Sequence, residues 1–237
     1  MINPNQNRIL LKLSGEFLMG KEQFGHDDKT IDQICQDILE VYNLGYQICL
    51  VVGGGNICRG IDLTSIGIER VSADYMGMLA TVINAIALQS KLENKNLITR
   101  ILSAIPIISI VEQYIRRKAI RHLEKNRIVI FASGTGNTFF TTDTAAVLRA
   151  TEMNCNVFLK GTKVNGVYND DPLKNLKAKK FYNLSYQDVL NNSLKIMDPT
   201  AITLAKDNYL PIKVFNISKK GSFAEALYNK QKFTLIS

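Results

Sequence analysis

The amino-acid sequence predicts an α/β fold, with helices on both faces of a mainly parallel sheet. Short apolar runs alternate with segments of helical periodicity along the whole chain, which is the pattern of strand–helix–strand units. One of these runs, Gln47–Val52, is apolar at nearly every position, as expected of a strand that is buried on both faces. With 237 residues, 46% of them hydrophobic and 21% charged, the chain is sufficient for a single domain over residues 1–237 with a full core.

The part of the chain before residue 161 supplies alternating strands and helices. The apolar run Arg8–Gly15 carries one embedded lysine and predicts the first strand. Residues 28–44 place apolar side chains on one stripe at helical spacing, and Gly45 suits the end of that helix. The next elements are predicted as a helix at about 72–93, a strand near 97–103, a helix at about 112–125, and then a strand at 127–132, a helix at about 142–153 and a strand at 156–160. The apolar run Met76–Leu88 within the 72–93 helix is interrupted by Thr81 and Asn84.

The remaining part of the chain begins with a polar stretch, 161–180, which contains turn signals such as Asn165-Gly166. This stretch is the predicted boundary between two functional halves of one domain, about 8–160 and about 161–237. A capping box that starts at Ser185 and an Asp198-Pro199 pair each predict the start of a helix. The last elements are predicted as a strand at 212–217, a helix at about 222–229 and a strand near 233–236.

Composition narrows the class of protein. The net charge of +8 favours an anionic partner such as a nucleotide, a nucleic acid or an acidic lipid, without choosing among them. The cysteines form no C-x-x-C pair, so neither a zinc ribbon nor a disulfide framework is expected. The first residues are polar, and no apolar run reaches the ~18–20 residues of a membrane span. We therefore expect a cytoplasmic protein with reduced thiols and no membrane segment.

Four loops contain glycine and small polar residues, a composition that suits phosphate binding. They are Ser14-Gly15, Gly53–Asn56, Ser133–Asp143 and Gly161-Thr162, and each follows a predicted strand. Ligands of open α/β sheets bind at the carboxyl ends of the strands, and glycine lets backbone amides approach a phosphate there. Together the four loops predict a polyphosphate site, although each one alone is also explained as a tight turn. The patterns G-x-x-x-x-G-K-[ST] and G-x-G-x-x-G are absent, so any phosphoryl transfer uses another scaffold.

Charged residues near these loops are candidates for phosphoryl transfer, which needs cations around the migrating group. Lys12 and Lys160 each lie toward the end of a predicted strand, where a buried ammonium needs an anionic partner. The alternative for both is a lysine that extends to solvent. Arg59 is a candidate phosphate clamp or an ordinary surface arginine. Asp143 and Asp198 are candidates to organise the lysines or a metal, and each also suits a helix N-cap.

These motifs, taken in order, resemble one known family. The matching strings are Lys12–Gly15, Gly53–Gly60, Asp74–Thr81, Thr135–Asp143, Lys160–Val164 and Asp171-Pro172. Together they closely resemble the bacterial UMP kinases of the amino acid kinase superfamily, over about Arg8 to Ile236. The resemblance implies a three-layer αβα sandwich and a homohexamer built as a trimer of dimers. It also implies transfer of the γ-phosphoryl group of ATP, with Mg²⁺, to UMP to give UDP for pyrimidine nucleotide synthesis.

The resemblance also assigns roles to individual residues. The residues for ATP are Lys12, Leu13, Ser14, Gly15, Gly55, Arg59, Lys160, Thr162, Tyr168 and Asp171. The residues for UMP are Gly54, Asp74, Thr135, Gly136, Asn137, Thr138, Phe139, Phe140, Thr141 and Thr142, with Asp74 accepting hydrogen bonds from the ribose hydroxyls. The residues for catalysis are Lys12, Arg59, Asp143 and Asp198. No protein side chain is expected to bind the metal directly, because Mg²⁺ would be held mainly by the ATP phosphates.

Several positions depart from the family pattern. Thr138 stands where proline is expected, which should loosen the UMP loop slightly, and Asn156 and Asn165 stand where aspartate is usual. GTP activation and UTP inhibition are family properties, and GTP activation is tied to a segment that here comprises Gly20, Lys21, Glu22, Gln23, Phe24 and Gly25. The GTP site is usually lined by basic side chains. Gln89 and Glu93 occupy two of its expected positions while Arg100 and Arg127 remain, so we expect weak or absent GTP activation.

Three other classes of function remain as alternatives. A superfamily kinase for a carboxylate such as aspartate or acetylglutamate would need a cationic clamp in place of the 139–142 block. A non-catalytic anion-binding regulator on the same fold would be expected to lose the pair Lys12 and Asp143, and both are present. Nucleic-acid binding is suggested by net charge and by basic runs at 116–121 and 177–180, but no aromatic side chains are interleaved with them. We therefore do not expect nucleic-acid binding as the main role.

Overall fold

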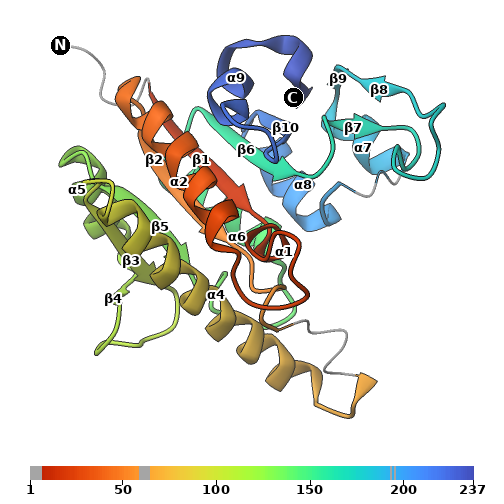
Figure 1. Ribbon diagram of the computed structural model, residues 1–237. Helices are drawn as coiled ribbons and strands as arrows, with labels where there is room; N and C mark the ends of the chain where they lie inside the picture. Colours follow the sequence, from red (N-terminus) through yellow and green to blue (C-terminus); the bar gives the residue numbers. More distant parts are fainter. Residues whose placement is uncertain (1–6, 59–64, 193, 195) are drawn as a thin grey trace.

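The structure is a computed structural model that describes residues 7–58, 65–192, 194 and 196–237 (Figure 1). In these residues, nine strands form one sheet whose long central strands are flanked by helices (Figure 1). The spatial order of the strands is β4 (Glu112–Gln113), β3 (Thr99–Ser103), β5 (Ile128–Ala132), β2 (Gln47–Val52), β1 (Arg8–Leu13), β6 (Val157–Thr162), β10 (Ile212–Asn216), β11 (Phe233–Ile236) and β9 (Asn183–Leu184). All neighbouring pairs are parallel except β10 and β11, so the prediction of a mainly parallel sheet is confirmed.

Two hydrophobic cores lie on the two faces of this sheet. Alternate residues of β1 point to opposite faces, with Leu11 in one core and Leu10 in the other, as the period of a strand requires. The first core is covered by α2 (Asp28–Asn43), α4 (Arg70–Glu93) and α9 (Ser222–Tyr228). The second is covered by α5 (Arg116–Glu124), α6 (Thr142–Glu152), α7 (Tyr186–Asn191) and α8 (Pro199–Asp207). The three-layer αβα arrangement is therefore confirmed.

The central strands set the geometry of the candidate site. β1 is fully buried and pairs with β2 on one side and with β6 on the other. In the register between β1 and β6, Lys12 pairs with Lys160. Two lysines that are far apart in the sequence therefore occupy the same position across two neighbouring strands.

The structure differs from the sequence prediction at several places, among them β6, which extends through Gly161 and Thr162, and β9, which was not predicted. The helix expected from about residue 112 begins at Arg116, because Glu112 and Gln113 extend the sheet as β4, parallel to β3. A short helix that was not predicted, α1 (Gly15–Leu18), follows β1 directly. The polar stretch 161–180 contains part of a two-stranded antiparallel sheet, β7 (Val167–Tyr168) with β8 (Lys180–Phe181), in addition to its turns.

Helix α4 is long and apolar enough to cross a membrane by length and composition, and it is the one such helix in the described residues. It packs on α2, β2, β3 and β5, as a core helix does, and 44% of its most apolar window is buried. Its other side exposes a stripe of large apolar side chains, Tyr75, Met76, Leu79, Ile83 and Ile86.

Candidate active site

Two lysines and one aspartate form an ionic cluster near the carboxyl ends of the central strands. Asp143 is the second residue of α6, and its carboxylate lies between the ammonium groups of Lys12 and Lys160. The Oδ1 atom of Asp143 is 2.9 Å from the Nζ of Lys12, and the Oδ2 atom is 2.5 Å from the Nζ of Lys160. The lysine side chains are each 11% exposed, so the alternative that they extend to solvent is wrong. This end of a parallel sheet is where ligands bind.

The ionisation states within this cluster depend on one another. Burial disfavours the ionised form of Asp143, but the charges of Lys12 and Lys160 outweigh burial and hold its pKa below the usual range. Burial lowers the pKa of Lys160, and the Asp143 carboxylate opposes that effect. The backbone carbonyl of Ile196 also accepts a hydrogen bond from the Lys160 ammonium. The aspartate therefore holds two cationic groups close together in a site with little water.

Asp198 lies in an adjacent set of contacts. Its Oδ1 accepts a hydrogen bond from the backbone N–H of Ala201 at 3.1 Å, so Asp198 is the N-cap of α8. The hydroxyl groups of Thr141 and Thr144 also donate to its carboxylate. The N-cap interpretation is wrong for Asp143, because Thr141 caps α6 by accepting a hydrogen bond from the backbone N–H of Thr144 at 3.1 Å. The carboxylate of Asp143 is consequently left to the lysines.

The turn after β1 and the loop after β2 approach so closely that glycine is required. A Cβ atom on Gly15 would lie 2.6 Å from the carbonyl oxygen of Gly53 and 2.7 Å from the backbone nitrogen of Gly55. A Cβ atom on Gly54 would lie 2.7 Å from the carbonyl oxygen of Gly77 in α4. No side chain fits at these separations, so the backbone itself forms the surface here. The structure thus brings together two of the loops predicted to bind phosphate.

The loop between β5 and α6 is tied to α4 at both ends. Ser133 and Phe139 have positive φ angles of 63° and 68°, which residues other than glycine seldom adopt. The backbone N–H of Ser133 donates to the Oγ1 of Thr81 at 2.7 Å, and that of Phe139 donates to the Oδ2 of Asp74 at 2.7 Å. The structure therefore brings Asp74 next to the loop 135–142, the two parts to which the resemblance assigns UMP.

A cavity of about 730 Å³ opens beside the ionic cluster, on the side of the chain that follows β6. Thr162, Tyr168 and Asp171, which the resemblance assigns to the nucleoside of ATP, all line it. Ile196 also lines it, and the carbonyl of this residue contacts Lys160. The structure thus brings the three predicted residues together in one cavity. Ile196 lines the same cavity and links it to the ionic cluster.

Sequence reasoning missed part of this cavity. Asn192, Leu194 and Ile196 line it and lie between α7 and α8. These residues form no motif and carry no charge. The signal in the sequence that could have found them is their position on the connection between two predicted helices.

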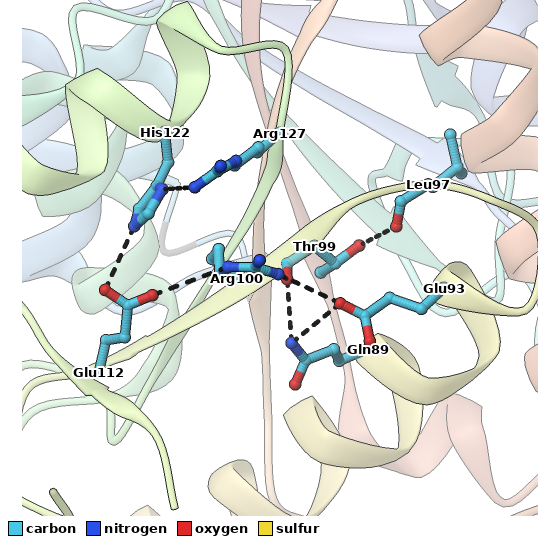
Figure 2. A network of polar contacts seen from close by, with 8 residues as sticks. All are labelled: Gln89, Glu93, Leu97, Thr99, Arg100, Glu112, His122 and Arg127. Atoms are coloured by element: carbon cyan, nitrogen blue, oxygen red, sulfur yellow. Dashed lines mark hydrogen bonds and ion pairs between the residues drawn. The ribbon is translucent and has the colours of Figure 1, made fainter.

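The residues that the resemblance links to GTP form two separate groups. Residues of the 20–25 segment line a cavity of about 800 Å³ together with the first half of α4, including Met76 and Leu79. Arg100 contacts Glu93 at the other end of α4, and Arg127 contacts His122 of α5 (Figure 2). Within this chain the 20–25 segment and Arg100 therefore adjoin different parts of α4.

Both of these arginines already have partners in the chain (Figure 2). The Nη1 of Arg100 is 3.3 Å from the Oε1 of Glu93, and its Nε is 3.9 Å from the Oε1 of Glu112 (Figure 2). The Nη1 of Arg127 donates to the Nδ1 of His122 at 3.1 Å, and the Nε2 of His122 lies 3.3 Å from Glu112 (Figure 2). An anionic effector at Arg100 would have to compete with Glu93 and Glu112.

The carboxylates of the site are engaged by other groups of the chain. In the described part of the chain, no group of three or more His, Cys, Asp or Glu side chains is placed to hold a metal. Both oxygens of Asp143 face lysines, and Asp198 is engaged by two threonines and the α8 backbone. Arg59 lies outside the described residues, and its predicted role stays a prediction.

Comparisons with known proteins agree with this geometry. A family model described as "Amino acid kinase family" matches residues 7–216. The chain is 57% identical over 229 residues to a uridylate kinase of Rickettsia massiliae, covering 97% of this chain and 95% of that protein. It is 55% identical over 234 residues to a uridylate kinase of Rickettsia bellii, covering 99% of this chain and 98% of that protein.

Solved structures show the same relationship. UMP kinase from Bacillus anthracis superposes with a TM-score of 0.93 at 39% identity, over 98% of this chain and 96% of that one. UMP kinase from Ureaplasma parvum superposes with a TM-score of 0.93 at 35% identity, over 98% of each chain. The resemblance found in the sequence motifs is thereby confirmed: the chain belongs to the amino acid kinase family and, within it, to the uridylate kinases.

Proposed function

We propose that this protein transfers the γ-phosphoryl group of ATP to UMP, giving ADP and UDP. The observation that carries this proposal is the Lys12–Asp143–Lys160 cluster, which lies where the two predicted nucleotide sites meet. Phosphoryl transfer needs little covalent chemistry from the protein and depends on positioning and on positive charge around the migrating group. A rigid pair of ammonium groups supplies that charge.

In the proposed reaction an oxygen of the UMP phosphate attacks the γ-phosphorus of ATP. The new P–O bond forms as the bond between the γ-phosphorus and the β–γ bridging oxygen breaks, and ADP leaves with that electron pair. No general base is required, because the attacking phosphate oxygen is already ionised near neutral pH. Lys12 and Lys160 offset the negative charge that shifts toward the leaving oxygen, and Asp143 keeps both lysines in position. Mg²⁺ bound with ATP would supply further positive charge on the phosphates.

We assign the two nucleotides to the two sides of this cluster. UMP is placed against Gly54, Asp74 and the loop 135–142, where the α4 contacts of Thr81 and Asp74 hold the loop in one conformation. The nucleoside of ATP is placed in the 730 Å³ cavity with Thr162, Tyr168 and Asp171. The backbone of Lys12–Gly15 and of Gly55 then faces the ATP phosphates.

We further propose that the exposed stripe of α4 is covered by a second copy of the chain in a homo-oligomer. Tyr75, Leu79, Ile83 and Ile86 are between 40% and 50% exposed on one side of a core helix. Contiguous exposed apolar surface of this kind marks interaction sites. A second copy offers the same stripe, so two α4 helices related by a twofold axis would cover each other. Light scattering on wild-type protein and on Leu79→Glu tests this, and equal masses for the two would contradict it.

The function is tested by following ADP release from ATP and Mg²⁺ with UMP, CMP, dUMP, aspartate and N-acetylglutamate offered in parallel. We expect turnover with UMP that falls by at least about 10²-fold in Lys12→Ala, since one electrostatic contact to the transition state has this magnitude. Turnover with a carboxylate in place of UMP would favour the carboxylate kinase. No turnover with any acceptor, in protein that still binds ATP, would favour an anion-binding regulator.

A further inference from the structure

A buried pair of asparagines lies beneath the loop that follows β2. Asn84 in α4 is 0% exposed and Asn56 is 2% exposed. The Nδ2 of Asn84 donates to the Oδ1 of Asn56 at 2.7 Å, and the Nδ2 of Asn56 donates to the Oδ1 of Asn84 at 3.0 Å. The two side-chain amides therefore form a reciprocal pair in the interior.

The second N–H group of each amide donates to a backbone carbonyl. The Nδ2 of Asn84 also donates to the carbonyl of Gly53 at 2.7 Å, and the Nδ2 of Asn56 also donates to the carbonyl of Gly25 at 2.7 Å. Both of these partners are acceptors only, so each Nδ2 must face its carbonyl and the orientation of both amides is determined. Two segments, one at Gly53 and one at Gly25, are thus joined to α4.

His26 completes the network from the solvent side. Its Nε2 lies 2.6 Å from the Oδ1 of Asn84. That oxygen can only accept, so Nε2 carries a proton and donates. All four hydrogen-bonding positions of the Asn84 amide are therefore used, and a fully satisfied buried network of this kind fixes one conformation.

We propose that Asn84 is a positioning residue that fixes the phosphate-binding backbone Gly53–Gly55. The Asn84 side chain touches no predicted substrate position, and it acts through the Gly53 carbonyl and through Asn56, which follows Gly55 directly. Gly53 in turn packs on Gly15 of the other phosphate loop, where a Cβ would meet the Gly53 oxygen at 2.6 Å. A displacement of the Gly53 carbonyl therefore moves both loops. This inference rests on the proposed function in that these loops hold the nucleotide phosphates.

The test compares Asn84→Asp with a matched control, Thr99→Val. Asn84→Asp keeps the shape of the side chain but replaces the donor to Gly53 by an oxygen. Thr99 is also 0% exposed, and its hydroxyl donates to the Leu97 carbonyl at 2.9 Å, away from the glycine loops. Both variants lose buried hydrogen bonds, so both are expected to unfold at a lower temperature. Only Asn84→Asp is expected to affect nucleotide binding.

The measurements are the Kd of ATP by calorimetry and the KM and kcat for both nucleotides, at a temperature where both variants are folded. We expect Asn84→Asp to raise the Kd of ATP and the KM values about tenfold or more, since hydrogen bonds to phosphate contribute that much. A merely structural role lowers the amount of active protein, which reduces the apparent kcat and leaves KM unchanged. Wild-type KM and Kd in folded Asn84→Asp, or equal rises in Thr99→Val, would overturn the proposal.

A second variant covers the case in which Asn84→Asp does not fold. His26 is exposed, so His26→Leu removes one donor to Asn84 with little risk to the fold. We expect a rise of about two- to tenfold in the Kd of ATP, the value of one hydrogen bond, and an unchanged Kd would overturn the proposal. The calorimetric result does not depend on the acceptor. A wild-type protein that binds ATP but ignores UMP would therefore refute the proposed function, while the Kd comparison would still decide the role of Asn84.

Discussion

The substitution Asp143→Asn tests the ionic cluster most directly. It preserves the shape of the side chain but removes the negative charge that lies 2.9 Å from the Nζ of Lys12 and 2.5 Å from the Nζ of Lys160. Two ammonium groups then remain close together in a site that excludes most water. Removing one partner of a buried ion pair costs about 3–5 kcal/mol. For a chain of this size that is a fall of roughly 10 °C in the unfolding temperature.

The difference in stability between wild type and Asp143→Asn should depend on pH. The pKa of Asp143 is held below its usual range in the folded protein, so its carboxylate stabilises the fold above the unfolded pKa of about 3.9. This contribution is lost as the pH falls through the lower, folded pKa. The difference between the unfolding temperatures of the two proteins should therefore be at its largest near pH 7 and should become smaller in acid below about pH 4.

Catalytic activity should also fall in Asp143→Asn, because the negative charge between the lysines is lost. Without the carboxylate the two lysines repel each other, and burial lowers the pKa of Lys160 with less opposition. We expect kcat to fall by about 10²–10³-fold in the assay of ADP release. The control is Asp32→Asn, which removes a carboxylate 2.8 Å from Lys95 on the surface and should change neither activity nor stability appreciably. If Asp143→Asn retained kcat within threefold and unfolded at the wild-type temperature, the reasoning about this cluster would be refuted.

Three further predictions concern the ligand sites. Asp74→Ala should raise the KM for UMP about tenfold or more with little change for ATP, because it removes a charged acceptor and releases the backbone of Phe139; a rise confined to ATP would reverse the assignment of the two sites. Tyr168→Ala should do the opposite and raise the KM for ATP several-fold. Steady-state kinetics with each nucleotide varied in turn measure this, and an unchanged KM for ATP would contradict the assignment. GTP titrated into the assay should stimulate turnover less than about twofold, because Arg100 is already paired with Glu93 and Glu112; several-fold stimulation would contradict this.

The main features of the site could be predicted from strand ends. Lys12 and Lys160 were found because a lysine at the end of an apolar run needs an anion, and Asp143 because an aspartate follows a glycine-rich loop. Their meeting could not be predicted from the residues alone, because it depends on the register of β1 against β6. The two interpretations of Asp143 were separated only when Thr141 proved to be the N-cap of α6.

The residues that tie helix α4 to the site interrupt the apolar pattern of this helix. Thr81 and Asn84 interrupt an apolar run, and on their own they argue only against a membrane span. In the structure these two residues bond to Ser133 and Gly53, in the loops after β5 and β2. A polar residue inside an apolar helix therefore indicates a buried backbone partner. Which partner it has depends on packing between elements that are far apart in the chain.

In the proposed mechanism, the register between β1 and β6 makes the alignment of two strands a condition for catalysis. A slip of one residue would turn every side chain of β1 to the opposite face and place Leu11 or Leu13 across from Lys160. The sheet could still bury apolar residues in that alignment, but the two cationic groups would no longer meet. Substitutions that weaken the pairing at the start of these strands, such as at Ile9 or Val157, should thus reduce turnover before they reduce the helix content of the protein.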